Sequence, residues 1–213
     1  GGRITGDTLR DIMWMMLVRT STVPWVPLAL ERAAAGDEAV IRKLDALYGG
    51  IDGGFGDISE GQSLAVVCYE IFGGRTTDAR KMVFQRHPYL VAQDAIPSDY
   101  DELCASWQPQ RAPLTFHAPV FSEVPTLLYG GEFDPATPYD DAVLAAKNLP
   151  NGTLVYVKGA SHAAFALDDC TRGIAHAFLD APSKQPDLGC LAQRKDTVFP
   201  TEGLMEFLAS QEG

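Results

Sequence analysis

Two side chains suited to acid–base chemistry stand just after two apolar segments of the chain. Asp134 follows residues 126–129 (TLLY), and His162 follows residues 153–158 (TLVYVK). Aliphatic, β-branched and aromatic residues predict a strand at each segment. Because the carboxyl ends of parallel strands open onto one crevice, we expect the carboxylate and the imidazole to meet there. A histidine oriented by a carboxylate is what a hydroxyl nucleophile needs in order to lose its proton during attack.

A hydroxyl nucleophile, a histidine and a carboxylate together form a catalytic triad. The motif that would carry the nucleophile is not recognisable in this sequence. The turn that exposes a catalytic serine reads Gly-x-Ser-x-Gly, and it occurs nowhere in the 213 residues. Ser161 stands beside His162, but adjacent side chains on an extended loop point apart, which makes it a poor partner. We therefore expect the nucleophile on another piece of a larger enzyme. The remaining histidines lack a comparable setting and are expected in surface or packing roles: His87, His117 and His176.

The residues between the acid and the base predict a turn followed by a helix. Pro135 keeps the backbone of Asp134 out of the helical region, and Thr137 is predicted to cap the helix with Pro138 at its first position. Asp134 has a simpler interpretation as a turn or cap former. That interpretation explains an acid in a turn, but not a histidine at the end of the next strand.

A change in composition divides the chain into two parts. Residues 1–110 are helical in pattern; the first amphipathic stripe is predicted to begin after a cap at Asp7 or Thr8, and residues 111–213 alternate strand and helix. We therefore predict a mainly helical cap or lid followed by an α/β part with parallel strands. The boundary lies in a proline-rich connector that holds Pro109, Pro113, Pro119 and Pro125.

Two residues of the helical part are candidates for substrate contact. Trp14, with the neighbouring Met15 and Met16, would suit an apolar pocket, although helical spacing more often indicates ordinary core. Glu70 lies in the apolar run 64–72, for which we favour a helix. Its carboxylate would suit a cationic substrate group, or it would simply face solvent, the interpretation that the residues alone favour.

Four cysteines allow three different pairings. Sequential pairing, Cys68 with Cys104 and Cys170 with Cys190, closes one loop in each half, and each bridge would stabilise the fold by about 3 to 4 kcal/mol. Such bridges indicate an oxidising, extracytoplasmic compartment. Four buried free thiols are the alternative. None of the cysteines has the Cys-x-x-Cys spacing of a zinc site, and the sequence indicates no metal or cofactor.

Net charge and hydropathy exclude some partners. The net charge of -11 and a pI near 4.7 argue against nucleic acid and anionic membrane surfaces, which reward clustered Lys and Arg. No window approaches 18 uninterrupted apolar residues, so no membrane span is expected. The first residues, Gly1-Gly2-Arg3, do not begin a signal peptide, and the start looks internal to a longer protein.

Several motifs together resemble one family. Residues 124–138 (VPTLLYGGEFDPATP) and 152–165 (GTLVYVKGASHAAF), followed by Cys170 and Cys190, resemble the carboxyl-terminal part of secreted α/β-hydrolases of the tripeptidyl aminopeptidase type, relatives of the prolyl aminopeptidases. Two earlier stretches resemble the helical cap of the same family: residues 6–37 and AVVCYE at 65–70.

This resemblance implies a fold, a reaction and a set of roles. The fold would be the last strands and helices of an α/β-hydrolase after a helical cap, with Asp134 as triad acid and His162 as triad base. It implies the sequential disulfide pairing, and Glu70 as receptor for the free amino terminus of a peptide. The reaction would be release of amino-terminal residues or short peptides through an acyl-enzyme. The serine would come from the amino-terminal part of the same enzyme, in a Gly-x-Ser-x-Gly turn.

Two alternatives remain open. The first is an esterase or lactone hydrolase of small molecules, with the same triad and an apolar pocket at Trp14, Met15 or Met16. The second belongs to another class of protein, a non-catalytic binding or structural subunit that keeps the acid and the base. Family alone does not choose among these functions.

Overall fold

The computed structural model describes residues 5–49, 59–71, 82, 85–86, 99–107 and 110–211, and they form two compact units. The first unit joins Gly1–Gly53 to Val120–Gly213, and the second is Gly54–Pro119. These two units do not test the division into a cap (1–110) and a core (111–213), which stays a prediction.

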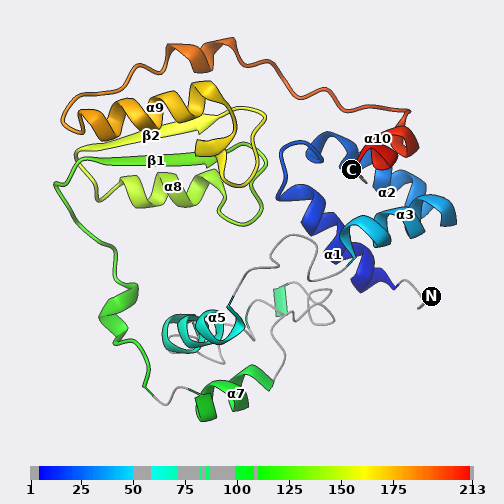
Figure 1. The fold of residues 1–213 in the computed structure, drawn as a ribbon. Helices are drawn as coiled ribbons and strands as arrows, with labels where there is room; N and C mark the ends of the chain where they lie inside the picture. The colour runs from blue at the N-terminus through cyan, green and yellow to red at the C-terminus, as the bar shows by residue number, and fades with distance from the viewer. Residues whose placement is uncertain are drawn as a thin grey trace. The chain divides into compact units, whose positions relative to one another are not determined.

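Figure 1 labels the helices and strands. The first unit contains α1 (Gly6–Leu17), η1 (Val23–Trp25), α2 (Val26–Ala34), α3 (Glu38–Tyr48), β1 (Thr126–Gly131), α8 (Tyr139–Ala146), β2 (Gly152–Val157), η5 (Ala164–Ala166), α9 (Asp169–Asp180), η6 (Gly189–Gln193) and α10 (Leu204–Ser210).

The two predicted strands form a parallel pair. β1 and β2 run in register from Thr126 opposite Gly152 to Gly131 opposite Val157, so their carboxyl ends lie side by side. Figure 1 shows α8 and α9 on either side of the pair. Val155 and Val157 are fully buried and pack with Ile174 of α9 in one apolar cluster. This cluster anchors the strand ends from which the acid and the base extend.

The glycine pair at the end of β1 extends the strand two residues beyond the predicted segment 126–129. A Cβ added at Gly130 would lie 2.5 Å from the ring of Tyr139, the first residue of α8. A Cβ added at Gly131 would lie 2.4 Å from the carbonyl oxygen of Ser161. Glycine is needed here because the strand is closely approached by α8 and by the loop that carries His162, residues 158–163, called the base loop below.

A second core of the same unit is helical. Residues from α1, α2, α3 and α10 pack together, and Trp25 stacks on Phe207 with 4.5 Å between ring centroids. The last helix thus shares a core with the first three. The buried side chains of this core include Ile12, Met13, Met15, Met16, Val26, Leu28, Ala29, Val40, Leu44, Tyr48, Leu204 and Leu208.

The second unit is built around a disulfide. It contains α5 (Glu60–Val66), η2 (Val67–Ile71), α7 (Asp99–Trp107) and η4 (Leu114–His117). The bond joins Cys68 to Cys104, and both residues are buried. The apolar run around Glu70 is helical as expected, but it changes from an α-helix to a π-helical turn at Val67.

Two predicted helix starts are wrong by one to three residues. The cap of α1 is Thr5, not Asp7 or Thr8; its hydroxyl accepts from the Thr8 backbone N–H while Thr8 caps in return. A reciprocal pair of this kind satisfies two backbone donors at once, which outweighs a single cap further along. The cap of α8 is Pro138 rather than Thr137, whose hydroxyl is used elsewhere.

The described residues therefore combine helices with a small, parallel, two-stranded sheet, which is consistent with part of an α/β fold. Within the described ranges, every helix is too short or too polar to cross a bilayer. The two disulfides are compatible with an extracellular location.

Candidate active site

The acid and the base that follow the two strands are in hydrogen-bond contact. Nδ1 of His162 lies 3.0 Å from Oδ2 of Asp134 and 3.2 Å from Oδ1. The Asp134 side chain is 5% exposed and that of His162 is 45% exposed. Among the described residues, Nε2 of His162 has no hydrogen-bond partner. One ring nitrogen is therefore held by a buried carboxylate while the other is left to accept a proton.

The Asp134 carboxylate is surrounded by donors from the turn that follows it. The backbone N–H groups of Ala136 and Thr137 donate to Oδ1 at 2.9 and 3.0 Å, and the Thr137 hydroxyl donates to Oδ2 at 2.8 Å. Burial acts to raise the pKa of Asp134, but these hydrogen bonds, with that of His162, outweigh it and lower the pKa below its ordinary value. The carboxylate is thus kept ionised, as an orienting acid must be.

Backbone and side-chain hydrogen bonds connect the base loop to the loop that carries Asp134, residues 132–138, called the acid loop below. The Phe133 backbone N–H donates to the Ala160 carbonyl at 2.8 Å, and the Gly159 N–H donates to the Glu132 carboxylate at 2.7 Å. Gly159 has a φ of 73°, a conformation that favours glycine. These hydrogen bonds lie between the strand ends and His162. They therefore fix the position of the imidazole relative to the Asp134 carboxylate.

Ser161 is used for structure, in agreement with its exclusion as a nucleophile. Its side chain is fully buried, and its hydroxyl donates to the Leu17 carbonyl at the end of α1. Its backbone N–H donates to the Thr20 hydroxyl at 2.9 Å. The residue before the base therefore holds its loop to the turn that follows α1.

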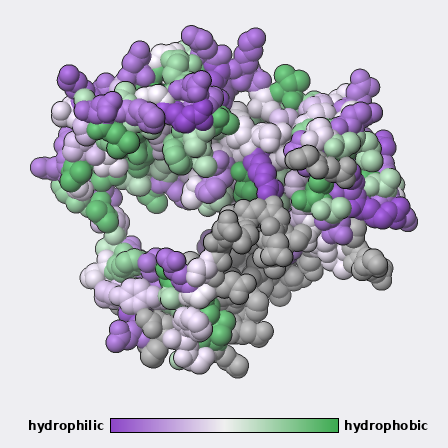
Figure 2. Space-filling model, viewed as in Figure 1, coloured by the Kyte–Doolittle hydropathy of each residue, from purple (hydrophilic) through white to green (hydrophobic). Residues whose placement is uncertain are grey.

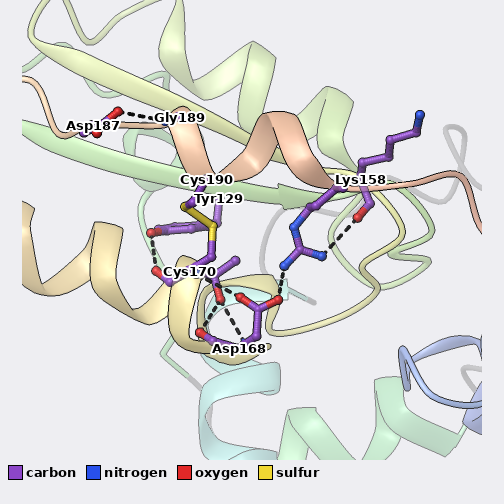
Figure 3. The surroundings of a disulfide bond; sticks show 9 residues. Tyr129, Lys158, Asp168, Cys170, Asp187, Gly189 and Cys190 are labelled. Carbon is purple, nitrogen blue, oxygen red and sulfur yellow. Dashed lines mark hydrogen bonds and ion pairs between the residues drawn. A yellow bond between two sulfur atoms is a disulfide. The ribbon is translucent and has the colours of Figure 1, made fainter.

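The carboxyl-terminal tail holds the start of the base loop in place (Figure 3). The disulfide joins Cys170 at the start of α9 to Cys190 in η6, the sequential pairing that the sequence predicts. Arg194 then pairs with Asp168, the cap of α9, and donates to the Lys158 carbonyl at 3.3 Å. Because Lys158 directly follows β2, this arrangement anchors the origin of the base loop.

The other residues predicted to contact substrate lie on two separate helices of the structure. Trp14 is 43% exposed on α1, whereas Met15 and Met16 are buried in the helical core and are not free to line a pocket. Glu70 is half-buried in the π-helical turn of the second unit. The contacts of Trp14 and Glu70 do not test a role in substrate binding, and both roles stay predictions.

Sequence reasoning missed two groups that support the pair. The Thr137 hydroxyl was expected at a helix start, and Glu132 had no expected role at all. The spacing Asp-x-x-Thr is the signal for the first, because it places a hydroxyl within reach of a preceding carboxylate. Nothing in the sequence points to the second. In the described part of the chain, no group of three or more His, Cys, Asp or Glu side chains is arranged to hold a metal ion.

Comparison with known families finds a match. Residues 89–190, just under half of the chain and including both Asp134 and His162, match the family model described as TAP-like protein. The match supports an α/β-hydrolase of the tripeptidyl aminopeptidase-like family, and with it hydrolase activity. No curated protein and no solved structure matches the chain.

Proposed function

We propose that the chain supplies the acid and the base of a serine hydrolase that acts through an acyl-enzyme. The observation that carries the proposal is the contact of 3.0 Å between Nδ1 of His162 and the buried Asp134 carboxylate, with Nε2 left to take a proton. In this reaction, His162 takes the proton of the attacking serine and passes it to the leaving group. Asp134 holds the ring and stabilises the imidazolium.

The serine belongs to a segment outside this sequence that carries a Gly-x-Ser-x-Gly turn. Two features support a partner segment beside β1. In the described part of the chain, β1 and β2 pair only with each other. Apolar residues lie among polar ones on the face that carries β1 and α8 (Figure 2). The apolar residues more than half exposed just before β1 and on α8 are Val120, Phe121, Val124 and Leu144.

Labelling by a fluorophosphonate tests the proposal, because the reagent requires an activated serine. The full-length enzyme that contains this chain should be labelled at one serine, and His162→Ala should remove the label. His176→Ala, at an exposed position on α9, is the control and should keep it. A full-length protein without a labelled serine would favour the non-catalytic binding or structural subunit instead.

The favoured substrate is a peptide with a free amino terminus. Glu70 is the proposed receptor for that ammonium group, and its position in a π-helical turn supports this, because such turns are frequent at functional sites. The second candidate is an esterase or lactone hydrolase, with the exposed Trp14 as an apolar contact.

Substrate comparison separates the two candidates. Glu70→Gln should lower kcat/KM for an aminoacyl arylamide by about 10- to 100-fold, the effect of losing a hydrogen bond to a charged group. An ester without an amino group should be hydrolysed at the wild-type rate. Equal rates of arylamide hydrolysis by variant and wild type, together with fast ester hydrolysis, would favour the esterase.

A further inference from the structure

We propose that Thr137 is a positioning residue of the Asp134–His162 pair, and that its hydroxyl fixes the carboxylate oxygen that orients the imidazole. The proposal rests on the function proposed above. Its basis is the place of one oxygen atom: Oγ1 of Thr137 lies 2.8 Å from Oδ2 of Asp134 and 3.4 Å from Nδ1 of His162.

The direction of each hydrogen bond follows from the chemistry of the carboxylate. Ionised Asp134 is an acceptor only, so the Thr137 hydroxyl must donate its single proton to Oδ2. Nδ1 of His162 must also donate, since it faces the same carboxylate. A neutral imidazole with its proton on Nδ1 has a lone pair on Nε2, the form that a general base requires.

The hydroxyl does what the backbone donors of the turn do not. Both backbone N–H groups, those of Ala136 and Thr137, donate to Oδ1. Oδ2 is the oxygen closer to Nδ1, at 3.0 Å against 3.2 Å. Apart from the imidazole, the Thr137 hydroxyl is its only donor among the residues that the structure describes. Without the hydroxyl, the carboxylate would keep one fixed oxygen and would turn more freely about the bond to its β-carbon.

Thr137 contributes little to packing. It is exposed, and Pro138 rather than Thr137 occupies the cap position of α8. A core or cap role therefore does not explain why a hydroxyl stands three residues after the acid. The hydrogen bond to Asp134 does, because it keeps the carboxylate both ionised and correctly turned.

Two variants at this position isolate the hydroxyl. Thr137→Val keeps the shape of the side chain but removes the donor, and Thr137→Ser keeps the donor. Carbon-13 NMR of the Asp134 carboxyl and nitrogen-15 NMR of the His162 ring, recorded on the full-length enzyme, report the ionisation of the acid and the tautomer of the base directly. In Thr137→Val the pKa of Asp134 should rise and the share of imidazole protonated on Nδ1 should fall, while Thr137→Ser should match the wild type.

In the full-length enzyme, Thr137→Val should lower kcat about tenfold and leave KM within about twofold, and Thr137→Ser should restore kcat. If the enzyme hydrolyses nothing, the proposed function fails, but the NMR titration still decides the role of Thr137. An unchanged Asp134 pKa and an unchanged tautomer in Thr137→Val would overturn the proposal. Equal losses of kcat in both variants would also overturn it, because only one of them lacks the hydroxyl. If Thr137→Val does not fold, Thr137→Ala removes the same donor and takes its place.

Discussion

At the scale of single residues, the candidate site depends on a close approach that only glycine allows. Gly131 ends β1 directly beside the backbone of the base loop. The distance between the acid loop and the base loop is set there, by the absence of a side chain. Any group added at this position must push the two loops apart.

Gly131→Ala is therefore expected to destabilise the fold by about 1 to 3 kcal/mol, because the new methyl group would meet the Ser161 carbonyl oxygen at 2.4 Å. Urea unfolding measures this change. Gly173→Ala in α9 is the matched control: nothing lies within 4 Å of its added Cβ, so it should stabilise the helix by up to about 1 kcal/mol. Similar effects of both substitutions would refute the role given to Gly131.

The residue types at the site could be anticipated better than their partners. Asp134 and His162 stand out because an acid and a histidine follow successive strand-like segments. The contacts of Glu132 and Ser161 could not be anticipated, since they join residues distant in sequence, such as Ser161 and Leu17. The sequence predicts a helix cap at Thr137 because local rules do not weigh a competing carboxylate.

At the scale of elements, the start of α9 connects a capping acid to the carboxyl-terminal tail. Asp168 accepts from the Thr171 backbone N–H at 3.0 Å and pairs with Arg194. Burial acts to raise the pKa of Asp168, but the hydrogen bond from Thr171 and the charge of Arg194 outweigh it and lower the pKa. The folded protein therefore binds this proton less readily than the unfolded chain does.

This difference predicts an acid-sensitive contribution to stability. A carboxylate with a lowered folded-state pKa stabilises the fold above its unfolded pKa, about 3.9, and that stability is lost as the pH falls through the folded value. Asp168→Asn should cost no more than about 1 kcal/mol at pH 7, because the group is partly exposed. Its free energy of unfolding should also fall less steeply than that of the wild type between about pH 5 and pH 2. Parallel pH profiles from urea unfolding would contradict this assignment.

Element types followed from sequence more readily than their ends. Residues 126–129 and 153–158 predict strands, and the structure has them as Thr126–Gly131 and Gly152–Val157. The first strand is longer than the predicted segment because it continues through Gly130 and Gly131. Their role depends on what packs against them, which local sequence does not contain.

At the scale of the whole molecule, the two ends of the chain build one helical core. Leu208 of α10 is fully buried in the cluster that includes Met16 and Leu44. Hydrophobic periodicity predicts the first helices and the last helix separately, because it depends only on residues close in sequence. A core shared across the length of the chain is therefore beyond its reach.

Leu208→Ala should destabilise the protein by about 2 to 5 kcal/mol, the usual effect of a cavity in a core. Thermal or urea unfolding measures the change. Val198→Ala, at a side chain that is 80% exposed, should change the free energy of unfolding by less than about 0.5 kcal/mol. A small loss at Leu208 would mean that the last helix is not part of the core.

In the proposed reaction, His162, oriented by Asp134, is the general base of a hydrolase. The most direct test is the kcat/KM of the full-length enzyme for its better substrate, aminoacyl arylamide or ester, in His162→Ala and in the control His176→Ala. We predict a loss of about 10⁴-fold or more for His162→Ala and wild-type activity for His176→Ala. A His162→Ala enzyme that keeps its activity within tenfold of the wild type would contradict it.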